Sequence, residues 1–308
     1  ALGVNLMLGP SLDVIDSANI GSPGDPGTKS FGSDPYWVSE MGKAFISGLK
    51  LGSQEELLVI GKHLPGIGGA DRPVDEEVPT IRKSLTELIQ IELAPFFAVT
   101  NPLQAGETPI DGMLLTHIQF QGFTGNIYST TRPASFDSNV LSELLNLDQF
   151  SAWREDGGLI VSDKLGVESI RKYYDPTEQT FNARIVARDA LLSGNDLLYL
   201  YNFKDNDDPD SYTSIIRTLD FFSQKYRDDQ PFAERVDESV LRILTKKFSL
   251  YENFNLDLVL SPEESLEIIG TGEQVTFSVA QEAVTLLWPS LESLDLQSPG
   301  SSEDIVFI

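Results

Sequence analysis

Short hydrophobic runs alternate with longer amphipathic stretches along most of the chain. The hydrophobic runs have the length and composition of β-strands and lie at 4–14, 56–63, 111–120, 157–166 and 195–202. Apolar residues recur at helical spacing over 34–51, 84–99, 137–147, 178–193, 211–228 and 232–250. This repeated alternation of strand and helix predicts an α/β fold in which helices cover a parallel sheet.

Three of the predicted helices carry start signals. Asp34 followed by Pro35 opens the first helix, and Ser84 and Asp137 stand at the N-cap positions of two others. Side-chain oxygens at these positions accept hydrogen bonds from backbone N–H groups that the first helical turn leaves unpaired. We therefore expect helices to begin at these three residues.

Polar side chains follow nearly every predicted strand at the point where it ends. They are Asp13, Lys62 with His63, His117, Asp163 and Asn202. Active sites of (β/α)8 barrels and ligand sites of doubly wound sheets both lie at the carboxyl ends of parallel strands, so this placement alone does not separate the two folds. About five strands precede residue 205, which is too few to close an eight-stranded barrel.

The pattern changes after Leu250. A loop-like stretch is followed by a predicted helix at 278–288, a linker-like segment and a final apolar run at 305–308. The chain also opens at Ala1 without an initiator methionine. We expect both ends to be cut within a fold.

Composition excludes several classes of function. Asp and Glu outnumber Lys and Arg by 47 to 22, and the net charge of −25 would repel nucleic acid and anionic lipid. The absence of cysteine excludes disulfides, thiol nucleophiles and zinc thiolate sites. No apolar run approaches the roughly 20 residues of a membrane span, so none is expected in this segment.

The strand-end residues allow a catalytic and a structural interpretation. Asp163 follows four apolar residues, where a carboxylate serves as a nucleophile or caps the following loop. Lys62 and His63 precede a glycine-rich loop as either a substrate grip or a hydrogen-bonded pair that anchors the turn, and His117 is typical of a satisfied core histidine. Because neither histidine has a partner at metal-ligand spacing, we expect no metal and no cofactor.

Several motifs, in order along the chain, resemble glycoside hydrolase family 3, and within it the bacterial β-N-acetylglucosaminidase-like branch. The resemblance covers roughly residues 3–250 and rests on "GPSLDV" (9–14), "GKHLPG" (61–66), "LLTHI" (114–118), "GLIVSDKLG" (158–166) and "LLSGNDLLYL" (191–200). It implies a TIM-type (β/α)8 barrel over 1–255 that lacks its first two strand–helix units. Residues 256–308 would then form a linker and the beginning of a second α/β sandwich domain.

The resemblance also assigns roles to individual residues. Family members are retaining hydrolases, and Asp163 matches their nucleophile. The positions that match the sugar subsite are Asp13, Lys29, Lys62, His63 and His117. A polar pocket of this kind suits the hydroxyl groups of a pyranose.

The chain departs from this pattern where the branch carries its proton donor. The resemblance places a histidine and its supporting aspartate at positions that here hold Ile67 and Gly69, and isoleucine cannot transfer a proton. Lys164 stands where an aspartate often follows the nucleophile, and Lys29 replaces an arginine. The candidates for acid/base within the chain are Asp71, Asp75 and Glu76. A glutamate in the missing second domain is the other option.

Two functions of different class follow. The first is a retaining exo-glycosidase that hydrolyses β-linked sugars, terminal N-acetylhexosamine among them, through a glycosyl-enzyme on Asp163. The second, which Ile67 favours, is a catalytically impaired carbohydrate-binding or cell-surface scaffold protein. In both cases the partners are a carbohydrate and the remainder of the same chain at both ends. The absence of cysteine, the acidity and the resemblance favour an extracellular or cell-surface location.

Overall fold

The computed structural model describes residues 3–101, 108–128, 130–177, 179–251, 267 and 270–283. The chain divides into two compact units, one of Val4–Leu258 and one of Ala1–Gly3 with Val259–Ile308. Helix α12 (Glu273–Glu282) belongs to the second unit. Most of the segment expected to hold a linker and the start of a second α/β domain, and the end of the helix expected at 278–288, lie outside the described residues.

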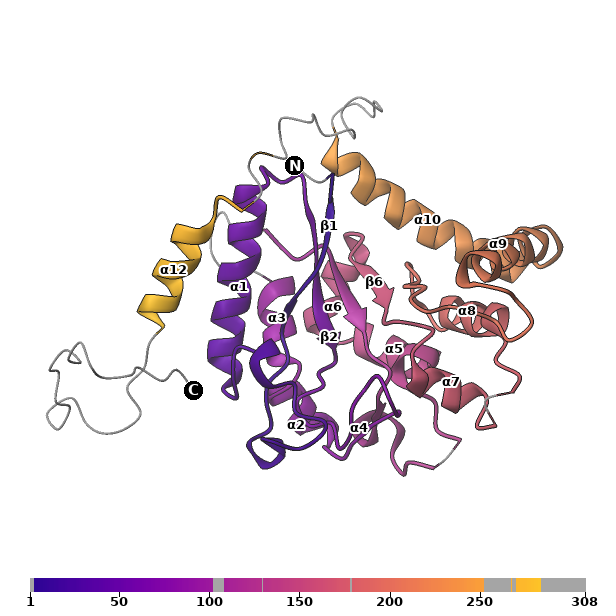
Figure 1. Cartoon of the computed structure of the whole chain (residues 1–308), viewed down its shortest axis with the longest axis horizontal. Helices are drawn as coiled ribbons and strands as arrows, with labels where there is room; N and C mark the ends of the chain where they lie inside the picture. The colour runs from indigo at the N-terminus through magenta and orange to yellow at the C-terminus, as the bar shows by residue number, and fades with distance from the viewer. Residues whose placement is uncertain are drawn as a thin grey trace, which may run out of the picture. The chain divides into compact units, whose positions relative to one another are not determined.

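A parallel sheet forms the centre of the first unit (Figure 1). Its four strands run in the order β1-β2-β4-β6, and all neighbouring pairs are parallel. The strands are β1 (Leu6–Ser11), β2 (Leu58–Leu64), β4 (Gly112–Leu115) and β6 (Leu159–Ser162). A second parallel pair is formed by β3 (Thr80–Ile81) and β5 (Gln119–Phe120). The prediction of an α/β fold with a parallel sheet is confirmed.

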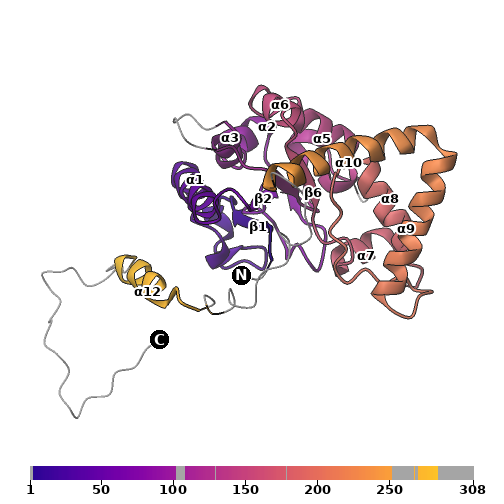
Figure 2. The same ribbon diagram turned by 90° about the horizontal axis from the view of Figure 1, so that it is seen from above.

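Helices cover the outer face of this sheet in an arc (Figure 2). The helices described in this unit are α1 (Pro35–Gly52), α2 (Leu85–Gln90), α3 (Ala94–Thr100), α4 (Gln121–Thr124), α5 (Ser138–Leu145), α6 (Asp148–Glu155), α7 (Glu168–Tyr174), α8 (Ala183–Leu192), α9 (Ser211–Asp228) and α10 (Gln230–Leu250). Buried apolar side chains of the strands and of α1, α3, α5 and α6 form one continuous core. This packing holds the carboxyl ends of the strands at one edge of the sheet.

The predicted helix starts are confirmed by cap geometry. Asp34 accepts a 2.8 Å hydrogen bond from the backbone N–H of Tyr36 at the start of α1, and Asp137 caps α5 in the same way. Ser84 and Glu87 exchange hydrogen bonds at the start of α2 in a capping box. These starts are predictable because the residues that make them lie within a few positions of one another.

Two predicted elements are wrong in their extent. The helix expected over 84–99 is two helices, because Pro95 has no backbone N–H to continue the ladder and instead lies in the first turn of α3. The strand expected over 195–202 is reduced to an isolated bridge between Val161 and Leu197. Beyond that bridge, the backbone N–H of Tyr199 donates to the Ser162 hydroxyl at 2.9 Å in place of a ladder bond.

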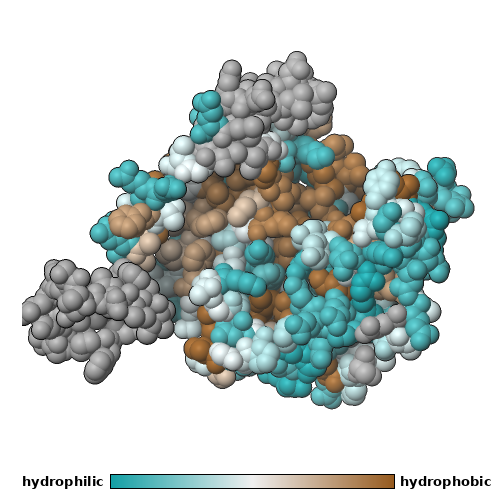
Figure 3. All heavy atoms as spheres, viewed as in Figure 1, coloured by the Kyte–Doolittle hydropathy of each residue, from teal (hydrophilic) through white to brown (hydrophobic). Residues whose placement is uncertain are grey.

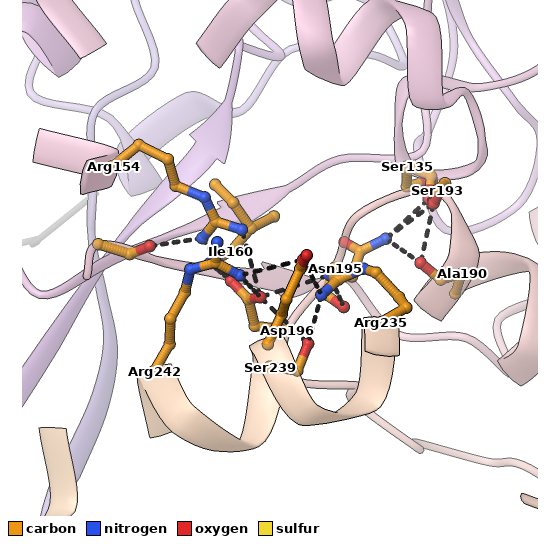
Figure 4. A network of polar contacts seen from close by, with 12 residues as sticks. Ser135, Arg154, Ile160, Ala190, Ser193, Asn195, Asp196, Arg235, Ser239 and Arg242 are labelled. Carbon is orange, nitrogen blue, oxygen red and sulfur yellow. Dashed lines mark hydrogen bonds and ion pairs between the residues drawn. The ribbon is translucent and has the colours of Figure 1, made fainter. Parts of the chain in front are cut away.

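Helix α10 is joined to the sheet through a buried carboxylate (Figure 4). Asp196, which precedes the bridge residue Leu197, accepts hydrogen bonds from Arg154 of α6 and from Arg235 and Arg242 of α10. Its carboxylate is fully buried, so its charge is met by three guanidinium groups rather than by water. This network fixes the last helix of the unit against the amino end of β6.

The edge of the sheet at β1 carries exposed apolar residues. Hydrophobic residues form much of the surface over the strands between α1 and α10 (Figure 3). Val4 and Met7 are 64% and 37% exposed, and Trp37 on α1 is 60% exposed. Among the described residues β1 has β2 as its one hydrogen-bonded neighbour, and the strands form an open sheet. The (β/α)8 barrel therefore stays a prediction.

Candidate active site

A cavity of about 830 Å³ lies at the carboxyl ends of β1, β2 and β6. The predicted site residues that line it are Lys29, Lys62, His63, Asp75, Glu76 and Asp163. The apolar part of its lining includes Met7, Leu8, Pro10, Phe31 and Phe45. The topology thus brings together polar residues that the sequence places as much as 134 positions apart, from Lys29 to Asp163.

Asp163 stands directly after β6 and lines the cavity, although the residue as a whole is only 5% exposed. Its backbone N–H donates to the carbonyl of Leu115 at 3.0 Å, which continues the pairing between β6 and β4. One carboxylate oxygen accepts a 2.7 Å hydrogen bond from the backbone N–H of Lys164. Within the described part of the chain no other donor is bound to this carboxylate, so a ligand in the cavity can approach it.

Asp13 lies behind His63 and is not part of the cavity lining. It is fully buried, and one of its oxygens accepts hydrogen bonds from the backbone N–H groups of His63 (3.2 Å) and Ile67 (2.9 Å). The other oxygen contacts Nδ1 of His63 at 2.8 Å and the Ser11 hydroxyl at 2.6 Å. Asp13 therefore orients His63 and the loop that follows it, while a direct contact of Asp13 with sugar stays a prediction.

The Asp13–His63 pair shifts the pKa of both partners. Burial raises the pKa of the Asp13 carboxyl, but the charge of His63 and the hydrogen bonds from His63, Ser11 and Ile67 outweigh it and lower the pKa. Burial lowers the pKa of His63, but the charge and hydrogen bond of Asp13, helped by the charge of Asp163, raise it. A protonated imidazole donates from both ring nitrogens, so Nε2 remains available to donate into the cavity.

His117 is a core histidine whose two ring nitrogens are both used. Nε2 lies 3.0 Å from the backbone carbonyl of Lys164, which can only accept, so Nε2 carries the proton. Nδ1 then accepts from the Ser135 hydroxyl at 2.6 Å. Burial lowers the pKa of His117 and keeps the ring neutral. His117 does not line the cavity, and it holds the peptide that follows Asp163.

The three candidate acid/base residues occupy different environments. Asp71 lies outside the cavity lining and accepts hydrogen bonds from Arg72 and from the backbone N–H of Thr80. Asp75 and Glu76 both line the cavity. Asp75 forms an ion pair with Lys164, with Nζ 2.5 Å from Oδ2. The cavity therefore holds two of the three candidates.

The loop after Lys62 and His63 packs closely against neighbouring backbone. Ile67 is buried among core residues and lines the cavity. A Cβ added at Gly68 would lie 1.7 Å from the carbonyl oxygen of Val14, so only glycine fits this approach of two backbones. A Cβ at Gly69 would meet nothing closer than 3.5 Å, at Nζ of Lys83. Lys83 forms ion pairs with Asp16 and with the buried Glu92.

Two groups of cavity residues could not be predicted from polar side chains at strand ends. Tyr199 lines the cavity from the segment beside β6, and its polarity is not visible as a strand-end change because the whole segment is aromatic and aliphatic. Phe31 and Phe45 form an aromatic pair with ring centroids 6.3 Å apart. The spacing of Phe45 within a helix indicated only a core position.

The described residues contain no group of three or more His, Cys, Asp and Glu side chains that could hold a metal ion. None of the helices in the described ranges is both long enough and apolar enough to cross a membrane.

The Asp13–His63 pair predicts a specific dependence of stability on pH. Because the folded-state pKa of His63 is raised above 6.5, its contribution to the free energy of unfolding is complete below pH 6.5. That contribution is lost as the pH rises through the folded-state pKa. Asp13→Asn should abolish this loss, since burial without the aspartate lowers the histidine pKa. Urea unfolding of both proteins at pH values from about 6 to 9 measures the difference.

His117 supplies an internal control for this measurement. Burial lowers its pKa below 6.5, so it favours the folded state less as the pH falls below that value and does not change above it. The fall above pH 6.5 therefore reports His63 rather than His117. A natural protein whose stability rises through this upper range would contradict the proposed pairing.

Comparisons with known proteins match one family model and several named relatives. The sequence profile of the glycosyl hydrolase family 3 N-terminal domain matches residues 1–245. The β-hexosaminidase LpqI of Mycobacterium tuberculosis is 26% identical over 247 residues, which cover 80% of this chain and 55% of that protein. The β-hexosaminidase of Methylococcus capsulatus is 27% identical over 224 residues, covering 71% and 55%. The chain thus spans about half the length of these curated relatives.

Solved structures share the fold. A glycoside hydrolase family 3 β-N-acetylglucosaminidase from Paenibacillus superposes with a TM-score of 0.62 at 23% identity, covering 86% of this chain and 45% of that one. A β-N-acetylhexosaminidase from Beutenbergia cavernae gives a TM-score of 0.60 at 20% identity, covering 80% and 63%. At these identities the likeness concerns the arrangement of strands and helices.

Proposed function

This chain belongs to glycosyl hydrolase family 3, and from that membership and the cavity we propose that it hydrolyses β-linked glycosides with retention of configuration. The observation that carries the proposal is the position of Asp163. Its carboxylate follows β6, lines the cavity and has one oxygen without a donor among the described residues. The same cavity presents Lys62 and His63, which suit the hydroxyl groups of a sugar.

The proposed reaction has two steps. In the first, the Asp163 carboxylate forms a bond to the anomeric carbon as the bond from that carbon to the leaving oxygen breaks. A second carboxyl group gives its proton to the leaving oxygen. In the second step the same group takes a proton from water, and the water oxygen displaces Asp163 from the anomeric carbon. Of the three residues that the sequence offers for this second group, Asp75 and Glu76 line the cavity.

The substrate class is proposed from the relatives. Two curated relatives are named β-hexosaminidases, and two solved structures are named β-N-acetylglucosaminidase and β-N-acetylhexosaminidase. We therefore expect a terminal N-acetylhexosamine as the sugar. The charged groups Lys62 and His63 would bind its hydroxyls, while Phe31 and Phe45 supply an apolar surface for the leaving group.

Family membership also supports the prediction of a (β/α)8 barrel in which β1 is the third strand. Val4 just before the edge strand, Met7 on it and Trp37 on α1 are exposed, and a further strand and helix there would bury them. In such a barrel the cavity at the carboxyl ends of the strands is the usual place for catalytic residues.

Turnover of activated glycosides tests the proposed function. The protein should release nitrophenol from nitrophenyl β-N-acetylglucosaminide faster than from the β-glucoside, and the first-formed sugar should be the β-anomer by NMR. An activated leaving group is chosen because it needs little help from a proton donor. Sugar binding without turnover of either compound would instead favour the carbohydrate-binding scaffold that Ile67 first suggested.

A further inference from the structure

The loop that carries Asp75 and Glu76 is attached to the segment that begins with Asp163. Three contacts join them. The Lys164 ammonium is paired with the Asp75 carboxylate at 2.5 Å, and the backbone N–H of Ser169 donates to the Asp75 carbonyl at 3.0 Å. Nζ of Lys172 lies 3.4 Å from the carbonyl of Glu76. The position of this loop relative to the nucleophile is therefore set through residues 164–172.

Of the residues from 164–172 that make these contacts, Lys164 lines the cavity. Its backbone N–H binds the Asp163 carboxylate at 2.7 Å while its side chain reaches Asp75, and its ammonium lies 5.9 Å from the ring centre of Tyr201. Burial lowers the pKa of Lys164, but the hydrogen bond and charge of Asp75 and the charge of Asp163 raise it. The side chain is therefore a cation at neutral pH and holds Asp75 by charge as well as by hydrogen bonding.

The ion pair gives Asp75 and Glu76 different roles. The Asp75 carboxylate is engaged by the Lys164 ammonium at 2.5 Å, and this contact fixes its place in the loop. Glu76 also lines the cavity, and among the described residues its side chain has no hydrogen-bond or ion-pair partner. The two neighbours thus divide into an anchored residue and a free one.

We propose that Lys164 is a positioning residue that, through Asp75, holds the 71–77 loop over the cavity so that Glu76 donates the proton to the leaving oxygen. The proposal rests on the proposed function and assigns its acid/base. It gives a role to the lysine that stands after the nucleophile and to a loop without a histidine. Glu76 would be the catalytic residue, and Lys164 would act through the loop.

A series of leaving groups tests this assignment. Lys164→Met should lower kcat/KM by about 10- to 100-fold on a methyl glycoside, whose leaving oxygen needs a proton, and by less than about threefold on a dinitrophenyl glycoside. Lys164→Arg, which can still pair with Asp75, should recover most of the loss. Asp75→Asn should behave like Lys164→Met, and the double variant should be no worse than either single variant.

The proton donor itself is identified by rescue with azide. Glu76→Ala should lose about 100-fold or more in kcat/KM on the methyl glycoside and little in kcat/KM on the activated one. On the activated glycoside kcat should fall, because the second step has lost its base. Added azide would attack the glycosyl-enzyme where water needs a base, forming a carbon–nitrogen bond as the bond to Asp163 breaks, and the product would be the β-glycosyl azide. Rescue of Asp75→Ala in place of Glu76→Ala would overturn the division of roles.

Backbone exchange tests the positioning role without relying on turnover. The amide N–H groups of Glu76 and Glu77 both bond to the carbonyl of Pro73, so they report the order of the loop. Hydrogen exchange at these amides should quicken at least tenfold in Lys164→Met and stay unchanged in Lys164→Arg. Unchanged exchange in Lys164→Met would overturn the proposal even if the natural protein turns over substrate. If exchange is faster in Lys164→Met but the natural protein does not turn over substrate, the anchoring by Lys164 is upheld and the proposed function is rejected.

Discussion

Replacing Asp163 with asparagine should lower kcat/KM for a β-linked glycoside by about 10⁴-fold or more, since loss of a catalytic nucleophile has effects of this size. An amide neither bonds to the anomeric carbon nor neutralises the positive charge that develops there. The fold should survive, because asparagine keeps the shape of the side chain and can still accept the 2.7 Å hydrogen bond from the N–H of Lys164. The measurement is initial rate on a nitrophenyl glycoside, with circular dichroism as a check of folding.

A matched control and a rescue make the result specific. Asp207→Asn changes an exposed carboxylate outside the cavity and should leave the rate unchanged. Asp163→Gly opens space at the nucleophile, and added azide should restore part of the rate by attacking the anomeric carbon directly. Since this attack comes from the face that Asp163 occupied, the product should be the α-glycosyl azide.

Covalent trapping locates the nucleophile independently of mutation. A 2-fluoro glycosyl fluoride should release fluoride and leave a stable glycosyl ester on the protein. The fluorine at carbon 2 slows both steps, and the good leaving group offsets this in the first step only, so the ester accumulates. Mass mapping should find the added sugar on the peptide that contains "GLIVSDK". A label on any other peptide would contradict the assignment of Asp163.

The helices and the parallel sheet could be predicted from the sequence where the signals are local. Asp34, Ser84 and Asp137 mark helix starts because each bonds to backbone groups two or three positions away. The extent of the strand expected at 195–202 could not be predicted from such local signals. Its pairing depends on the Ser162 hydroxyl, which takes the N–H of Tyr199. Ser162 lies 37 positions from Tyr199, so this hydrogen bond leaves no mark in the pattern of apolar and polar residues along 195–202.

The site was predictable to the extent that parallel strands end at the same edge. That rule brings Lys62, His63 and Asp163 into one cavity. It does not say which way a strand-end side chain points. Asp13 and His117 carry the same signal, yet one supports His63 from below and the other binds the carbonyl of Lys164. The choice between contacting a ligand and supporting a neighbour is made by packing between elements.

The second large effect expected is on stability, at Asp196. Its buried carboxylate lies 2.5 Å from Arg154, 3.3 Å from Arg235 and 3.2 Å from Arg242, and it also accepts from the Ile160 N–H and the Ser239 hydroxyl (Figure 4). Asp196→Ala would leave three half-buried or buried guanidinium groups without this anion. Removing one partner of a buried charge network costs about 3–5 kcal/mol. We expect a loss of that size in the free energy of unfolding, measured in urea.

Acid should weaken the same network. Burial raises the pKa of Asp196, but the hydrogen bond and charge of Arg154, the hydrogen bond from the Ile160 N–H and the charge of Arg235 outweigh it, so the pKa lies below 3.8. The contribution of Asp196 to stability is therefore complete above pH 3.8 and is lost as the pH falls through its folded-state pKa. Asp196→Ala should accordingly lose part of the acid dependence that the natural protein shows in this range.

Glu238 provides the matched control, because it contacts two of the same arginines from the solvent side. Its carboxylate lies 3.8 Å from Arg235 and 4.0 Å from Arg242 and is 61% exposed. Glu238→Gln should change the free energy of unfolding by less than about 1 kcal/mol, since water screens exposed ion pairs. Equal losses in the free energy of unfolding of the two variants would mean that any nearby carboxylate, exposed or buried, stabilises the arginines to the same extent. A larger loss in Asp196→Ala alone would place the stabilisation in the buried geometry that ties α10 to β6.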